Sequence, residues 1–69
     1  MSNANMYRNQ IKIGAVVDIT LKRDQGTERL TRGVVKRILT NKSYHSRGIK
    51  VELKDGQVGR VQRVIADFE

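Results

Sequence analysis

Cysteine is absent from the 69-residue chain, and histidine occurs once, as His45. Without cysteine the chain forms neither a disulfide nor a thiolate zinc site, and a single histidine cannot build a histidine-rich metal cluster. We therefore expect no metal and no cofactor. A chain of this length forms one domain and buries only about 60% of its unfolded surface. Its stability must come from packing, backbone pairing or a partner.

Aromatic residues and long apolar runs are also scarce. The chain has two Tyr, one Phe and no Trp, and no apolar run approaches the roughly 20 residues of a membrane span. The amino terminus lacks the apolar region of a signal peptide, so we expect a cytoplasmic protein. Aliphatic residues are abundant by contrast. Eight Val and six Ile stand against four Leu, and this excess of β-branched side chains favours strands over helices.

The first ten residues are polar and have no period. We expect a disordered tail over residues 1–10, in which Ser2-Asn3-Ala4 resembles the remnant of a cleaved tag. Residues 11–69 are then a single small domain. Ile11 and Ile13 begin it on one side of an extended segment.

Strands are predicted over residues 15–22, 30–39, 49–54 and 57–65. The first and third alternate apolar and polar residues, the period of a half-buried strand. In the second, Leu30, Val34 and Ile38 also fit a helical spacing of four, but the glycine and valines within it favour a strand. Asp55-Gly56, between the last two strands, is typical of a two-residue hairpin turn with positive φ at both positions.

Gly33 and Gly59 interrupt the alternation in their strands, so we expect a bulge or bend at each. Four or five short antiparallel strands in so short a chain are most economically arranged as a small, bent barrel. Closure of the sheet removes exposed strand edges, and the two glycines would provide the bends that closure needs. The predicted fold class is all-β.

Several blocks of the chain resemble the signature of the YwbE family, small bacterial proteins without an established function. The blocks are Asp24-Gln25, Leu30-Thr31-Arg32-Gly33, Ile38-Leu39-Thr40-Asn41, Gly48-Ile49-Lys50-Val51 and Asp55-Gly56-Gln57-Val58-Gly59-Arg60-Val61. The step Gly33-Val34-Val35 is also similar to KOW and other SH3-like barrels of the translation apparatus. This second likeness implies an SH3-like barrel and, by analogy, contact with RNA or the ribosome. Arg47 stands where the family pattern carries a second histidine, which argues against a two-histidine metal site.

The sequence does not indicate an enzyme. Ser43 and Ser46 lie near His45, but neighbours within one loop seldom reach the geometry of a nucleophile and its base. Asp55 is explained by the turn, and the glycine spacing does not match a phosphate-binding loop.

Basic residues are the feature with functional weight, because 14 Lys and Arg oppose seven Asp and Glu and give a net charge of +7. From the second strand onward they are expected to share one electropositive surface that attracts phosphates. Tyr44 and His45 lie at the tip of a basic loop, where an aromatic face can stack on an unpaired base. The predicted nucleic-acid-binding residues are Arg32, Lys36, Arg37, Lys42, Tyr44, His45, Arg47, Lys50, Arg60 and Arg63.

Two alternatives remain open. The charge can be a solvated surface with no partner, or the protein can pair with another protein through an exposed strand edge. Residues 15–22 are the better candidate for that edge, because they form the most regular predicted strand. The identity of the RNA and the oligomeric state do not follow from the sequence.

Overall fold

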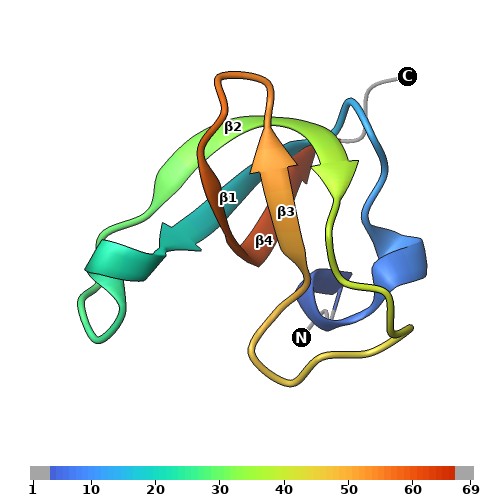
Figure 1. Cartoon of the computed structure of the whole chain (residues 1–69), viewed down its shortest axis with the longest axis horizontal. Helices are drawn as coiled ribbons and strands as arrows, with labels where there is room; N and C mark the ends of the chain where they lie inside the picture. The colour runs from blue at the N-terminus through green and yellow to red at the C-terminus, as the bar shows by residue number, and fades with distance from the viewer. Residues whose placement is uncertain (1–3, 67–69) are drawn as a thin grey trace.

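The computed structural model describes residues 4–66, which form four strands and three 3₁₀ turns and no α-helix (Figure 1). The strands are β1 (Val16–Leu21), β2 (Thr31–Ile38), β3 (Lys50–Leu53) and β4 (Val58–Ala66), and the turns are η1 (Ala4–Met6), η2 (Arg8–Gln10) and η3 (Lys22–Asp24). The all-β prediction is confirmed, and the ambiguous segment 30–39 forms a strand. None of the described helical turns is long and apolar enough to cross a membrane.

The four strands close into a small antiparallel barrel. Each strand pairs with the next, and β4 returns to pair with β1. β4 achieves this because it is long: residues 58–60 pair with β3 and residues 59–66 pair with β1. The predicted open edge at residues 15–22 is therefore wrong, since closure gives β1 a partner strand on each side.

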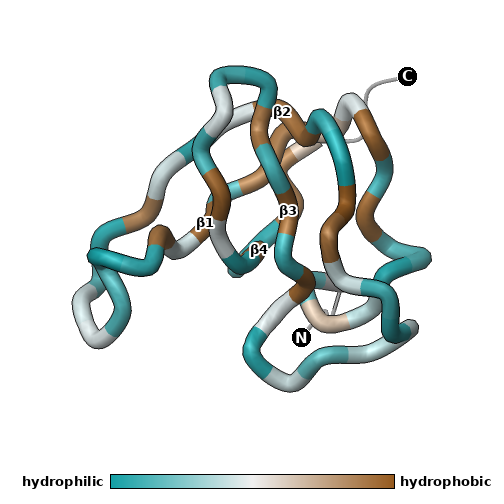
Figure 2. The backbone as a smooth tube through the Cα atoms, viewed as in Figure 1, coloured by the Kyte–Doolittle hydropathy of each residue, from teal (hydrophilic) through white to brown (hydrophobic). Residues whose placement is uncertain are grey.

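Alternating aliphatic side chains fill the barrel. The fully buried ones are Ile19, Ile49, Leu53, Val17, Val35, Val51 and Val61. Figure 2 shows hydrophobic and hydrophilic residues alternating along the strands, while the loops are mainly hydrophilic. Ile11 and Ile13 were predicted to lie on the same side of an extended segment, but Ile11 is buried and Ile13 is 64% exposed. A turn follows Ile13, closed by a hydrogen bond from the Ala15 amide to the Lys12 carbonyl at 3.0 Å, and it points Ile13 outward.

The turn between β3 and β4 differs from the prediction. Within residues 4–66 only glycines have positive φ, so Asp55 does not, whereas Gly56 has a φ of 92°. The Gly56 amide donates to the Leu53 carbonyl at 2.9 Å, and the Leu53 amide donates to the Gln57 carbonyl at 2.8 Å. These bonds define a three-residue loop that ends in a left-handed glycine. Asp55 stabilises it through its side chain, whose Oδ1 accepts from the Gln57 amide at 3.1 Å.

The register shifts of the barrel do not fall at Gly33 or Gly59, so of the two possibilities predicted there, a bulge or a bend, the bulge is wrong at both positions. They lie between Val35 and Arg37 in the pairing of β2 with β3, and at two places in the pairing of β1 with β4. Gly59 is needed for close packing, because a Cβ atom at this position would lie only 2.5 Å from the Thr20 carbonyl oxygen. The missing side chain lets β4 approach β1 closely.

Residues 4–10 are not a disordered tail, because they bind the loop between β2 and β3, residues 39–49 (Figure 1). The Ile49 amide donates to the Asn5 carbonyl at 2.8 Å, the His45 amide to the Met6 carbonyl at 2.9 Å, and the Arg8 amide to the Ser43 carbonyl at 2.9 Å. A long loop contains backbone donors and acceptors that need partners, and this segment supplies both, two carbonyls that accept and the Arg8 amide that donates. Residues 1–3 and 67–69 lie outside the described residues, as do Ser2 and Asn3 of the suspected tag remnant.

Candidate nucleic-acid interface

Asp18 lies on β1 between Arg32 of β2 and Arg63 of β4, its partners in the strand register. Arg32 donates to the carboxylate through Nε at 2.8 Å and Nη2 at 3.2 Å, and Arg63 donates through Nε at 2.7 Å. The two long side chains cover the carboxylate, whose side chain is 4% exposed. The hydrogen bonds from Arg32, followed by those from Arg63, hold the pKa of Asp18 below its usual value against the opposing effect of burial. Two predicted RNA-binding arginines thus share one carboxylate.

Arg60 occupies the corresponding central position in the next row. It stands on β4 between Thr20 of β1 and Lys50 of β3, so the central residue of this row is a cation, whereas the central residue of the first row is the carboxylate of Asp18. Arg60 donates through Nη1 to the Gly48 carbonyl at 3.3 Å, but neither it nor Lys50 forms an ion pair within residues 4–66. Like charges at directly opposed strand positions repel each other, so this row costs the folded state free energy.

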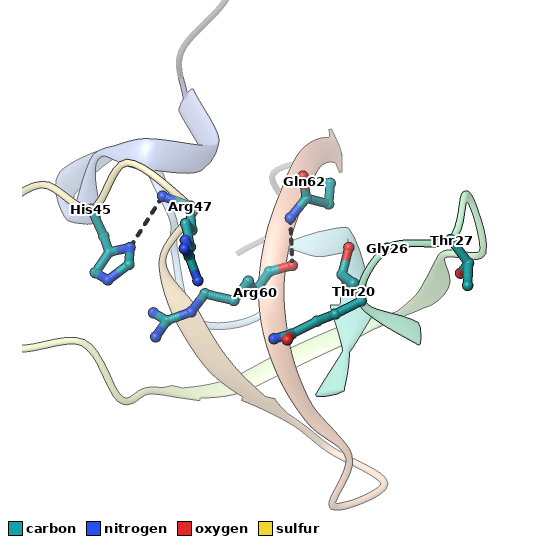
Figure 3. Close-up of a pocket in the computed structure, with 8 residues that line it drawn as sticks. Thr20, Gly26, Thr27, His45, Arg47, Arg60 and Gln62 are labelled. Carbon is teal, nitrogen blue, oxygen red and sulfur yellow. Dashed lines mark hydrogen bonds between the residues drawn. The ribbon is translucent and has the colours of Figure 1, made fainter. Parts of the chain in front are cut away.

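Two hollows adjoin at Arg60, and we call them together the Arg60 hollow. The larger, of about 500 Å³, is lined by Thr20, Gln25, Gly26, Thr27, His45, Arg47, Arg60 and Gln62 (Figure 3). The smaller, of about 380 Å³, is lined by Thr20, Lys22, Gln25, Lys50, Val58, Gly59 and Arg60. Among the described residues 4–66, no carboxylate lines either one. Asp24, adjacent to Gln25 in the chain, is only 7% exposed.

His45 and Arg47 enter the hollow from the 39–49 loop, on the side toward which the Arg60 guanidinium extends (Figure 3). The Nδ1 atom of His45 accepts a hydrogen bond from the Arg47 amide at 3.1 Å, which leaves the proton of the neutral ring on Nε2. Partial burial lowers the pKa of His45, and the positive charges of Arg60, Lys42 and Arg47 lower it further. The imidazole is therefore held neutral at pH 7 by a positive surrounding that an anion would balance.

Four of the ten predicted residues line the hollow: His45, Arg47, Lys50 and Arg60. The arginines of the first row do not, and Arg37 is paired with Glu52, Nε to Oε1 at 2.9 Å. Lys36 is exposed on β2, and Lys42 and Tyr44 are exposed on the 39–49 loop. The structure therefore splits one predicted basic face into neutralised and unneutralised parts.

Sequence reasoning missed other residues that line the hollow: Thr20, Lys22, Gln25, Gly26, Thr27, Val58 and Gln62. The alternation of residues 15–22 did place Thr20 and Lys22 on the outer face. Alternation does not show which strand lies beside these two residues, because β4 becomes the neighbour of β1 only when the barrel closes. Among residues 4–66, no group of three His, Cys, Asp or Glu side chains is arranged to hold a metal ion.

Comparison with known proteins links the chain to a family of unassigned function. Residues 4–64 match the family described as "Uncharacterized conserved protein (DUF2196)". The uncharacterised protein YwbE of Bacillus subtilis (strain 168) is 54% identical over 59 residues, which are 86% of this chain and 91% of that relative. No solved structure matches the chain. The family match includes the segment 4–10, which the polar sequence pattern had placed in a tail.

Proposed function

The chain belongs to the YwbE-like family of uncharacterised conserved proteins, and for this member we propose binding of RNA through its phosphates at the Arg60 hollow. One observation carries the proposal. Four cationic side chains line the hollow, and none has an ion-pair partner within residues 4–66: Lys22, Arg47, Lys50 and Arg60.

The chemistry of the lining fits a phosphate backbone. Arginine can hold a phosphate through two hydrogen bonds and lysine attracts it as a point charge. Gln25, Gln62 and Thr20 add neutral amide and hydroxyl donors, which are common in contacts to phosphates and sugars. The two parts of the hollow share Thr20, Gln25 and Arg60, so their linings form one continuous surface along which a polynucleotide can lie.

The proposal is for a binding module without catalysis, acting in the cytoplasm. A more specific version of the proposal is that the protein associates with the ribosome. The likeness of Gly33-Val34-Val35 to SH3-like barrels of the translation apparatus supports it by analogy. The earlier alternative, pairing with a protein through the edge of residues 15–22, loses its basis because both sides of β1 are paired.

A pair of charge-matched double variants tests the proposal. Arg47→Gln with Arg60→Gln removes two guanidiniums from the hollow, whereas Arg23→Gln with Arg29→Gln removes two exposed arginines that do not line it. Binding to a labelled RNA of about 12 nucleotides is followed by fluorescence anisotropy at several salt concentrations. We expect the first pair to weaken binding tenfold or more, about 1.4 kcal/mol. The control pair should weaken RNA binding by about threefold or less.

Salt dependence gives a second measure from the same titrations. Each lost phosphate contact should lower the log–log slope of affinity against salt by about 0.7 on a single strand. Thermal unfolding of both double variants is measured alongside, so that a destabilised barrel is recognised. Equal losses of RNA affinity in two equally stable variants would mean that general basicity, and not the hollow, accounts for binding. An absence of binding by the unmodified protein at low salt would refute the proposal itself.

A further inference from the structure

Tyr7 and Tyr44 form an exposed aromatic pair. Their ring centroids lie 5.1 Å apart with the planes tilted by 57°, and the two residues are 41% and 46% exposed. Their backbones form an isolated antiparallel bridge, and the Tyr44 hydroxyl donates to Sδ of Met6 at 3.8 Å. The pair is thus held from both chain segments while a large part of each ring faces solvent.

Tyr44 lies close to the Arg60 hollow along the chain, although neither tyrosine lines it. Tyr44 directly precedes His45, which lines the hollow, and Arg47 follows two residues later. The backbone hydrogen bonds from the loop to Asn5 and Met6 hold the 4–10 segment against this part of the loop. A strand whose phosphates lie on Arg47 and Arg60 would reach the two tyrosines by continuing along the 39–49 loop.

We infer that Tyr7 and Tyr44 form a stacking platform for unpaired bases, so that the protein selects single-stranded over duplex RNA. The inference rests on the proposed function and adds the class of RNA to it. Bases inside a duplex are already stacked on one another, whereas the bases of loops and single strands can lie against aromatic side chains. Such stacking is tolerant of sequence because every base has a π-face.

The 4–10 segment becomes part of the binding surface on this account. Tyr44 alone is one ring on a polar loop, whereas single-strand platforms commonly use two or three aromatic residues. Tyr7 supplies the second ring, and three backbone hydrogen bonds fix its segment to the loop. Loss of the segment would therefore remove both a stacking surface and the support of Tyr44.

Tyrosine fluorescence reports directly on the platform, because the chain has two tyrosines and no tryptophan and both tyrosines are in the pair. We titrate the unmodified protein with a single-stranded RNA of about 12 nucleotides and with the corresponding duplex. Anisotropy of a label on the RNA gives the two affinities in parallel. The single strand should quench tyrosine emission and bind at least about fivefold more tightly than the duplex.

Two double variants separate stacking from structure. Tyr7→Leu with Tyr44→Leu keeps apolar bulk and removes the rings, and should weaken single-strand binding about tenfold while leaving duplex binding unchanged. Tyr7→Phe with Tyr44→Phe keeps the rings and should retain the preference. Thermal unfolding shows whether the leucine variant remains folded. If it unfolds, the phenylalanine variant still tests the inference, because a loss of the single-strand preference with both rings in place would contradict stacking.

The outcomes for the two proposals differ. Equal affinity of the unmodified protein for single strand and duplex, with no tyrosine quenching, would overturn the stacking platform and leave phosphate binding intact. Failure to bind either RNA would overturn the proposed function. A leucine variant that stays folded and still prefers single strands would show that the preference has another source.

Discussion

Two rows of side chains cross the outer face of the barrel two residues apart along β1, about 7 Å, and they have opposite central charges. In the first row Arg32 and Arg63 flank Asp18, and in the second Thr20 and Lys50 flank Arg60. Each row joins three neighbouring strands, with its central residue on β1 in the first row and on β4 in the second. The first neutralises its arginines within the protein, whereas the cations of the second have no carboxylate partner in the described part of the chain.

The comparison shows that a count of basic residues does not identify a binding surface. An arginine that shares a buried carboxylate contributes to stability and is only partly available to a phosphate. A cation opposed by another cation weakens the fold slightly and gains from an anion that comes from outside. The first row should therefore govern stability and the second should govern RNA binding.

The largest expected effect follows from Asp18→Asn, which keeps the shape of the side chain and removes its charge. Arg32 and Arg63 then face a neutral amide in place of the carboxylate that accepts three hydrogen bonds. Solvent screens the exposed arginines, so we expect the free energy of unfolding to fall by about 1–2 kcal/mol, measured by urea denaturation. RNA affinity should stay the same or rise, because two arginines are released.

The acid sensitivity of the protein provides the control for this variant. The folded pKa of Asp18 is lowered relative to an unfolded value of about 3.9. The carboxylate therefore stabilises the protein above about pH 4, and this contribution is lost as the pH falls through the folded pKa. The unmodified protein should lose more stability than Asp18→Asn over this range. Identical acid profiles and equal stability at pH 7 would show that the first row does not govern stability.

A smaller effect is expected from two single variants on the same strand, Arg60→Gln and Arg63→Gln. The first should weaken RNA binding about threefold to tenfold and leave the melting temperature equal or higher, because it removes a repulsion with Lys50. The second should lower the melting temperature and change affinity by less than about twofold, since it removes one of the two partners of Asp18. Melting curves and binding isotherms together show whether Arg60→Gln changes mainly the affinity and Arg63→Gln mainly the melting temperature. Parallel losses of affinity would mean that the two rows are one surface.

The strands and their inner faces could be predicted because alternation is a local property. Val17, Ile19 and Val51 are buried where the period of two places them, and the strand bounds differ from the prediction by about one residue. Closure into a barrel was predicted from the number of strands in so short a chain and is confirmed, but the way in which the barrel closes could not be predicted. It depends on the length of β4 and on the register shifts that bend it around β1, and these are long-range properties.

The candidate site was predictable only in part, because alternation identifies the outward residues and not their neighbours. Asp18 was correctly placed on the outer face, but only the register shows that it stands between two arginines. Tyr7 was assigned to a tail because the sequence around it has no apolar period. Backbone hydrogen bonds with the 39–49 loop hold its segment, and such bonds leave no pattern in the side chains.

The smallest expected effect concerns His45, which lines the Arg60 hollow and should make RNA binding there depend on pH. Its pKa in the free protein is lowered by burial and then by Arg60, Lys42 and Arg47. A bound phosphate balances those charges and favours the imidazolium form, so binding takes up a proton as the pH falls below about 6.5. RNA affinity should rise about twofold to threefold between pH 7 and pH 5, measured by anisotropy at constant salt. His45→Gln should show a flat profile, because the chain has no other histidine, and a rise of equal size in that variant would place the pH dependence in another group.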